Sequence, residues 1–188
     1  TVMGIVIVHD GAVEFEHYPR MERHEKPIYW SVTKVFASTL IGILEHEDRI
    51  DVDQPVSAYV PRLARSSYGP ISVRNVLDMA AGLDCLEEYE DRDACYYRYS
   101  VTVGDGFFGS NSPDDPYALL ENLEVPAFAP QGTAYAYSGV NTFVLAWIVE
   151  ELTGMPFQDA VSHYLWTRMG PTAMRPCSHR GLVCPSRM

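Results

Sequence analysis

The sequence has few basic residues and no long apolar run, and each shortage excludes a class of function. Its 188 residues include 14 Lys and Arg against 25 Asp and Glu, which gives a formal net charge of −11. A chain this acidic is a poor partner for nucleic acid or for an anionic membrane surface. The apolar stretch after Thr142 is stopped by Glu150 and Glu151. The sequence therefore predicts no membrane-spanning helix.

Cysteine is also scarce. The four cysteines, Cys85, Cys95, Cys177 and Cys184, form no C-x-x-C pair and have no histidine at metal-ligand spacing. The sequence therefore predicts no metal site. A disulfide between Cys85 and Cys95 agrees with their spacing, but two free thiols agree with it at least as well, and the cysteines do not fix the redox compartment.

Acidic residues are missing from the last part of the chain, where no Asp or Glu follows Asp159. Residues 171–188 contain Arg, Pro, Ser and Cys without periodicity. We therefore expect one domain over residues 1–170, long enough for a sizeable core, and an atypical tail over 171–188.

Hydrophobic periodicity predicts both strands and helices. Apolar segments on either side of Asp10-Gly11 predict a β-hairpin, and alternating Glu residues in its second strand predict one wet face. Apolar residues at helical spacing predict helices near residues 30–45, 72–81, 116–123, 141–153 and 157–166. Residues 96–113 show no clear period and are interpreted as a loop, either a functional lid or a flexible segment.

One predicted helix carries a serine and a lysine in its first turn. Ser31 and Lys34 are three residues apart, and residues at that spacing share a helix face. Ser31 suits an N-cap or first-turn position, and the apolar residues behind it predict a helix buried on most sides. A partly desolvated lysine amine beside a hydroxyl can remove its proton, which makes Ser31 a candidate nucleophile for acyl transfer. The motif is also short enough to arise by chance, as a capping serine and a solvated lysine.

The order of several motifs is more informative than any one of them. Ser31-x-x-Lys34 is followed by Asp-Val-Asp-Gln-Pro-Val at 51–56, Ile-Ser-Val-Arg-Asn-Val-Leu-Asp-Met at 71–79, Pro-Gln-Gly-Thr at 130–133 and Tyr137-Ser138-Gly139. In this order the chain closely resembles the serine β-lactamase-like superfamily. That superfamily includes class C β-lactamases, D-alanyl-D-alanine carboxypeptidases, esterases and 6-aminohexanoate-dimer hydrolases. The segment from Leu77 to Tyr89 looks most like the last branch.

The resemblance implies an α/β (α+β) fold of the β-lactamase/transpeptidase type, with an antiparallel sheet flanked by helices and a helical insert. It implies that Ser31 is the nucleophile, Lys34 its base and Tyr137 a partner in proton transfer. The implied reaction forms an acyl-enzyme with a small ester or amide and needs no metal or organic cofactor. Gly139 and Asn141 are the candidates for substrate binding. The oligomeric state stays open.

Two features depart from the family pattern. Gly139 stands where the second family motif, Tyr-x-Asn, has its asparagine, and Asn141 is two residues further on. The third motif, Lys- or His-x-Gly on a late strand that completes the oxyanion hole, has no convincing counterpart, because His179-Arg180-Gly181 follows the last predicted helix too soon. The late strands are also missing. Because no Asp or Glu follows Asp159, we expect a truncated or frame-shifted product of a longer hydrolase gene, and the loss of the oxyanion donor predicts weak or no activity. A first residue other than Met leaves the true N-terminus, and with it the compartment, open.

Two other functions agree with these residues. One is a β-lactamase or D-alanyl-D-alanine carboxypeptidase. The other is a non-catalytic relative that binds a ligand or partner, which Gly139 and the missing third motif favour.

The residues around the motifs leave further choices. Tyr29 and Trp30 are expected to pack at the start of the helix. Acidic residues after Gly82 are interpreted as solvated surface; they include Asp84, Glu87 and Glu88. Four aromatic residues either line an acyl pocket or belong to a loosely packed loop; they are Tyr96, Tyr97, Phe107 and Phe108.

Overall fold

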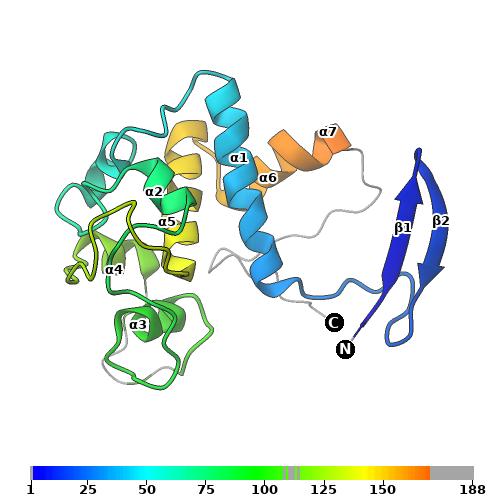
Figure 1. Ribbon diagram of the computed structural model, residues 1–188, viewed down its shortest axis with the longest axis horizontal. Coiled ribbons are helices and arrows are strands. Elements are labelled where there is room, and N and C mark those ends of the chain that lie inside the picture. Colours follow the sequence, from blue (N-terminus) through cyan, green and yellow to red (C-terminus); the bar gives the residue numbers. More distant parts are fainter. Residues whose placement is uncertain (1, 108, 110–112, 114, 170–188) are drawn as a thin grey trace. The chain divides into compact units, whose positions relative to one another are not determined.

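The computed structural model describes residues 2–107, 109, 113 and 115–169. The chain divides into two compact units between Ile28 and Tyr29. Within the described residues, the first unit holds the predicted hairpin and the second holds the helices (Figure 1).

The hairpin consists of the antiparallel strands β1 (Ile5–His9) and β2 (Ala12–His17). Asp10 and Gly11 form its turn at φ 48° and 77°, the left-handed conformation that a two-residue hairpin turn requires. The hairpin itself is confirmed. The expectation of a single wet face is wrong, because every residue of both strands is exposed. Alternation in the sequence identifies strands, but burial depends on what covers them.

The second unit is organised around α5 (Gly139–Thr153), whose residues 139–149 are all buried. Ser138 caps its first turn, because the serine hydroxyl accepts a hydrogen bond from the Val140 amide at 3.3 Å. Gly154 ends the helix at φ 67°, as a left-handed glycine commonly does. Such an apolar helix is stable only when surrounded. The surrounding helices are α1 (Lys34–His46), α2 (Val73–Leu77), α3 (Cys95–Thr102) and α6 (Phe157–Val161).

Short elements complete the second unit. They are η1 (Trp30–Thr33), η2 (Val56–Ala58), η3 (Pro61–Leu63), α4 (Pro116–Glu121), the π-helical turn η4 (Ser162–Trp166) and α7 (Thr167–Met169). The core beneath them includes the fully buried side chains of Leu40, Leu44, Leu63, Tyr68, Leu120 and Ile148. Removing these apolar surfaces from water is the main favourable term in folding. Among the described residues, no helix is both long enough and apolar enough to cross a bilayer.

The helix predicted at Ser31 differs from the expectation in its start and in its burial. Ser31 lies in η1 and caps neither that turn nor α1, which begins at Lys34. Burial is confined to one face, at Ala37, Leu40, Ile41 and Leu44. Val32 and Val35 are exposed, and so are Tyr29 and Trp30, which were expected to pack. The number of apolar residues in this segment therefore overestimates how much of the α1 surface is buried.

The interpretation of residues 96–113 as a loop is wrong in its first half, which forms α3. Tyr96, Tyr97 and Tyr99 are buried there. Tyr99 packs edge-on against Phe143 of α5, with ring centroids 5.7 Å apart. The eight residues of α3 are rich in Tyr and show no regular apolar spacing. The helix therefore depends on these tertiary contacts for its stability. Phe107 is 80% exposed, and Phe108 lies outside the described residues.

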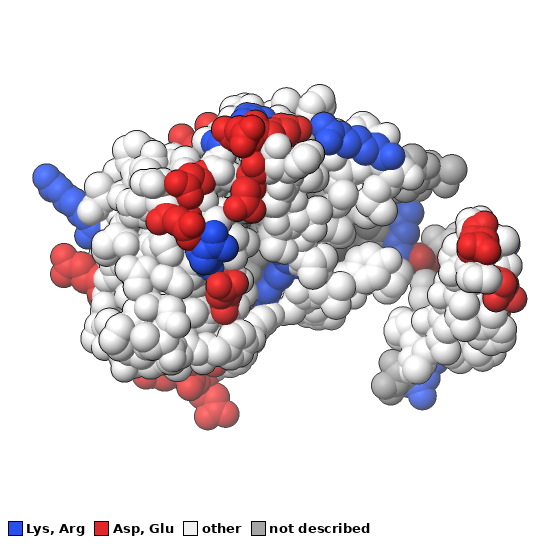
Figure 2. Space-filling model, turned by 45° about the horizontal axis from the view of Figure 1, so that its top comes forward, with Lys and Arg blue, Asp and Glu red and all other residues white. Residues whose placement is uncertain are grey.

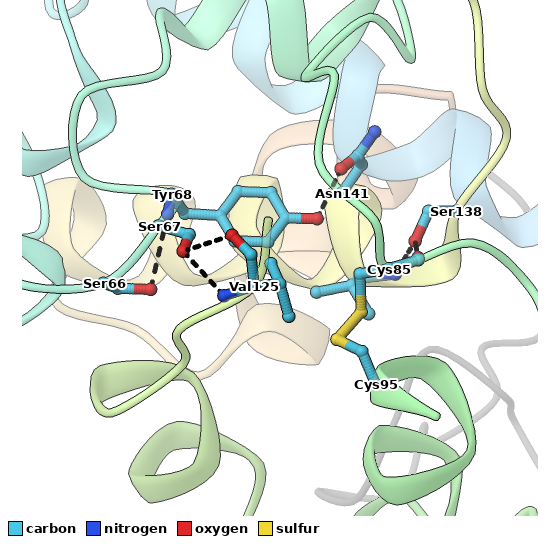
Figure 3. The surroundings of a disulfide bond; sticks show 9 residues. Ser66, Ser67, Tyr68, Cys85, Cys95, Val125, Ser138 and Asn141 are labelled. Carbon is cyan, nitrogen blue, oxygen red and sulfur yellow. Dashed lines mark hydrogen bonds between the residues drawn. A yellow bond between two sulfur atoms is a disulfide. The ribbon is translucent and has the colours of Figure 1, made fainter. Parts of the chain in front are cut away.

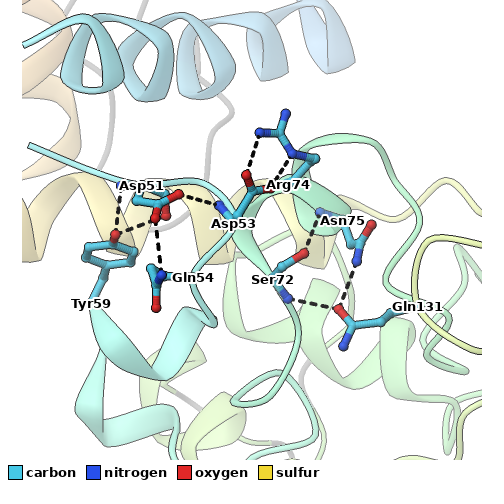
Figure 4. Close-up of polar contacts among 8 residues, drawn as sticks. All are labelled: Asp51, Asp53, Gln54, Tyr59, Ser72, Arg74, Asn75 and Gln131. Atoms are coloured by element: carbon cyan, nitrogen blue, oxygen red, sulfur yellow. Dashed lines mark hydrogen bonds and ion pairs between the residues drawn. The ribbon is translucent and has the colours of Figure 1, made fainter. Parts of the chain in front are cut away.

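A polar network holds the segment before α2 (Figure 4). Ser72 caps α2 as predicted, its hydroxyl accepting a hydrogen bond from the Asn75 amide at 3.2 Å. Gln131 Oε1 accepts hydrogen bonds from the Ser72 amide at 3.0 Å and from Asn75 Nδ2 at 2.9 Å. Arg74 donates to both carboxylate oxygens of Asp53, at 2.5 and 3.1 Å. We call Asp53, Ser72, Arg74, Asn75 and Gln131 the α2 network.

Candidate active site

Ser31 and Lys34 meet at the start of α1. Lys34 Nζ donates a hydrogen bond to Ser31 Oγ at 2.7 Å. The contact follows from the local structure, because a 3₁₀ turn has three residues per turn and places residues i and i+3 above one another. The Lys34 side chain is only 18% exposed, whereas Ser31 is exposed. A shielded amine beside an accessible hydroxyl is suited to proton removal from that hydroxyl.

The residue before Ser31 has an unusual backbone conformation. Trp30 has φ 47°, which is rare for a large side chain and costs free energy. The Thr33 hydroxyl donates to the Trp30 carbonyl at 2.6 Å and helps to hold this turn. Backbone strain of this kind is typical of functional sites, and here it precedes the candidate nucleophile.

Tyr137 joins the pair from the segment just before α5. Lys34 Nζ lies 4.7 Å from the centroid of the Tyr137 ring. This is a cation–π contact with the ring face. The fold therefore brings the Tyr137 ring beside the Lys34 amine, which holds the Ser31 hydroxyl, although Tyr137 lies about a hundred residues later in the sequence.

Glu87 also contacts Lys34, and the sequence interpretation of this residue as solvated surface is wrong. Glu87 Oε1 lies 3.7 Å from Lys34 Nζ, and the Glu87 side chain is only 19% exposed. Asp84 and Glu88 are exposed, as expected. Nothing in the acidic run distinguishes Glu87 from its neighbours, because burial is decided by the path of the loop.

One tyrosine binds the Glu87 carboxylate, and a second lies beside the first. The Tyr89 hydroxyl donates to Glu87 Oε2 at 2.8 Å and lies 3.4 Å from the Tyr96 hydroxyl. Desolvation by burial, the largest cause, raises the pKa of both hydroxyls above its usual value. Both therefore stay protonated at neutral pH. We call Ser31, Lys34, Glu87, Tyr89, Tyr96 and Tyr137 the Lys34 cluster.

A disulfide closes the loop that carries Glu87 (Figure 3). Cys85 and Cys95 are bonded to each other, which decides between the two alternatives left by the sequence. The Ser138 hydroxyl donates to the Cys85 carbonyl at 2.7 Å and ties this loop to the start of α5. Cys177 and Cys184 lie outside the described residues.

The two candidate substrate-binding residues have different surroundings. Gly139 is the first residue of α5, and a Cβ there would lie 3.2 Å from the Tyr96 ring and 3.5 Å from Glu87 Oε1. Gly139 therefore borders the Lys34 cluster.

Asn141 does not join the cluster through its side chain. It is 2% exposed, and its Oδ1 accepts a hydrogen bond from the buried Tyr68 hydroxyl at 2.7 Å (Figure 3). Its Nδ2 lies 3.4 Å from Met79 Sδ. These contacts give Asn141 a packing role in the core. His179-Arg180-Gly181, the alternative for the third motif, lies outside the described residues.

Charged side chains outside the Lys34 cluster form no metal site and, on the face shown, no basic patch, as far as the described residues go. Within the described part of the chain, no three His, Cys, Asp or Glu side chains converge as metal ligands would. On the face shown in Figure 2, Lys and Arg side chains are scattered among Asp and Glu rather than gathered into a basic patch.

The family model for β-lactamase matches residues 2–175. The chain belongs to the β-lactamase family. Among its relatives, the 6-aminohexanoate-dimer hydrolase of Paenarthrobacter ureafaciens is 38% identical over 146 residues, which are 77% of this chain and 36% of the relative. The chain thus spans well under half the length of that relative.

Solved structures of the family have the same fold. A Bacillus anthracis protein described as a 6-aminohexanoate-dimer hydrolase matches 89% of this chain with 44% of its own, at a TM-score of 0.71 and 24% identity. A class C β-lactamase matches 89% of this chain with 43% of its own, at a TM-score of 0.62 and 22% identity. Likenesses this distant show the fold alone, and they confirm the predicted α/β fold of the β-lactamase/transpeptidase type.

Proposed function

We propose that this family member is a serine hydrolase that cleaves small esters or amides through an acyl-enzyme. The observation that carries the proposal is the 2.7 Å contact between Lys34 Nζ and Ser31 Oγ, on a turn where Lys34 is shielded and Ser31 is open. We further propose that residues 1–170 form the hydrolase domain and that 171–188 are an atypical tail.

The proposed reaction uses groups of the cluster in order. Lys34, as the neutral amine, takes the Ser31 proton while Ser31 Oγ forms a bond to the substrate carbonyl carbon. The bond to the leaving group then breaks, and the alcohol or amine leaves with a proton returned by Lys34. Water attacks the acyl-serine ester in the same way and regenerates the hydroxyl. Tyr137, with its ring against Lys34, is the proposed partner in these proton transfers.

The substrate class follows from the branch of the family. The 38% identical relative is a 6-aminohexanoate-dimer hydrolase, so a linear amide of that kind is the natural first amide to test. p-Nitrophenyl acetate and butyrate test the ester reaction.

The first prediction concerns covalent labelling of Ser31 by a fluorophosphonate probe. Ser31→Ala should abolish labelling. Lys34→Ala should slow it by a factor of about 10² to 10⁴, the usual contribution of a general base. Ser38→Ala is the matched control, because Ser38 is an exposed serine of α1, the helix that follows η1 directly, and its loss should change nothing. Equal labelling of the Ser31→Ala variant would contradict the proposal.

A second candidate function is ligand binding without turnover, which the absence of a side chain at Gly139 favours. In that case Ser31 would not be labelled, while a linear 6-aminohexanoate dimer would still bind in a calorimetric titration. Turnover of nitrocefin, and not of the ester or the amide, would instead assign the chain to the β-lactamase activity of its family.

A further inference from the structure

The Glu87 carboxylate is arranged in a way that folding alone does not require. Its Oε1 is buried and has no hydrogen-bond partner among the described residues. Burying a carboxylate oxygen without a partner is unfavourable unless a nearby charge compensates. Lys34 Nζ, 3.7 Å away, supplies that charge.

We propose that Glu87 is a positioning residue for Lys34, whose carboxylate occupies the space beside Gly139 and holds the amine within reach of Ser31. The inference rests on the proposed function of Ser31 and Lys34. It assigns to a loop carboxylate the task of orienting the base.

The local structure explains why the carboxylate fits there. Gly139 has no side chain, and even a Cβ at this position would come 3.5 Å from Glu87 Oε1. An asparagine at position 139 would therefore compete with Glu87 for the same space. The first turn of α5 begins at Gly139, and the partial positive charge of a helix N-terminus favours a nearby carboxylate.

The groups around the pair show what Glu87 contributes. Lys34 faces the Ser31 hydroxyl, the Tyr137 ring and the Glu87 carboxylate. The carboxylate in turn accepts a hydrogen bond from Tyr89. Glu87 therefore brings the negative charge into this set of contacts and fixes the end of the Lys34 side chain by an ion pair. Removing that charge should let Lys34 Nζ move away from Ser31 Oγ.

The first experiment reads Lys34 directly and needs no reaction at Ser31. The chain is treated briefly with acetic anhydride at one fixed pH, and acetylation of Lys34 is followed by peptide mass spectrometry. Glu87→Gln should speed the acetylation of Lys34 several-fold, because the carboxylate 3.7 Å away no longer holds the amine. Glu90→Gln is the matched control, because Glu90 is exposed on the same loop, and it should leave the rate unchanged. An unchanged rate in Glu87→Gln overturns the proposal, whether or not the chain is an active hydrolase.

The second experiment measures positioning. In Glu87→Gln, the rate of fluorophosphonate labelling of Ser31 should fall about tenfold, because misplacing a catalytic group by a fraction of an ångström is costly. Glu87→Asp keeps the carboxylate and should recover most of the wild-type rate. A loss of labelling that merely parallels a loss of thermal stability, without this recovery in Glu87→Asp, would show a structural role only and overturn the proposal.

Discussion

The Lys34 cluster and the α2 network use similar residues in different surroundings. Each joins segments far apart in the sequence through an ion pair and nearby hydrogen bonds; Figure 4 shows those of the α2 network. In the α2 network, the side chains of Arg74 and Asp53 are 52% and 66% exposed. In the Lys34 cluster, both partners are less than one-fifth exposed. Because water screens the first pair more than the second, similar ion pairs contribute differently to stability.

The two regions also differ in how completely their polar groups are paired. In the α2 network, Gln131 and Ser72 together accept backbone and side-chain hydrogen bonds that fix the start of a helix. In the Lys34 cluster, one carboxylate oxygen is buried without a hydrogen bond among the described residues, and the Ser31 hydroxyl, which accepts the hydrogen bond from Lys34, stays exposed to solvent. Buried polar groups that lack a hydrogen bond and add no evident stability are more common at functional sites than in purely structural networks.

The largest expected effect comes from removing the disulfide beside the Lys34 cluster. Replacing both Cys85 and Cys95 by serine opens the loop between them, whose ends are ten positions apart in the sequence. This should lower the free energy of unfolding by about 2–3 kcal/mol through the entropy of the unfolded chain, as measured by urea unfolding. Because the loop carries Glu87, labelling of Ser31 should slow as well. Lower stability with unchanged labelling would show that the Tyr89 and Ser138 contacts suffice to hold Glu87.

A pair of glycine substitutions separates the two regions more sharply. Gly139→Ala should slow the labelling of Ser31 several-fold, because its Cβ would press on the Tyr96 ring at 3.2 Å and fill the space beside Glu87. Gly132→Ala touches the α2 network instead, since Gly132 has φ 80° and a Cβ there would lie 3.0 Å from Asn75 Oδ1. It should cost about 1–2 kcal/mol of stability, the usual penalty of a left-handed conformation, and leave the labelling of the folded protein unchanged.

The measurements for this pair are urea unfolding and fluorophosphonate labelling of both variants. The comparison between the two regions fails if Gly132→Ala slows labelling as much as Gly139→Ala does.

Local signals in the sequence predicted much of the fold. The Asp10-Gly11 turn, the Ser72 cap and the apolar run ended by Gly154 each specify an element through its own residues. The helix α3 could not be predicted, because its stability comes from the disulfide and from rings contributed by distant segments. The exposure of both hairpin faces, likewise, is a property of what packs on a strand rather than of its alternation.

The candidate site likewise contains residues that local sequence predicts and residues that only the fold places. The spacing of Ser31 and Lys34 predicted their contact, because one helical turn brings them together. Tyr137 could be placed beside them only through the family resemblance. Glu87 could not be identified, since its role depends on a loop path fixed by Cys85, Cys95 and Ser138. Asn141 was proposed for substrate contact, but it is buried against Tyr68.

The smallest expected effect concerns the exposed pair of the α2 network. The hydrogen bond from Arg74 holds the pKa of Asp53 below its ordinary value of 3.8. A carboxyl with a lowered pKa in the folded state stabilises the fold above its unfolded pKa, and this contribution is lost as pH falls through the folded value. Asp53→Asn should therefore be slightly less stable than wild type at neutral pH, and the difference should close below the ordinary value. Urea unfolding of both proteins from about pH 7 to about pH 2 measures the difference, because proton linkage confines it to the carboxylate form. A difference that persists in acid would mean that Asp53 acts through its hydrogen bonds rather than its charge, and the contrast with Glu87 would then rest on burial alone.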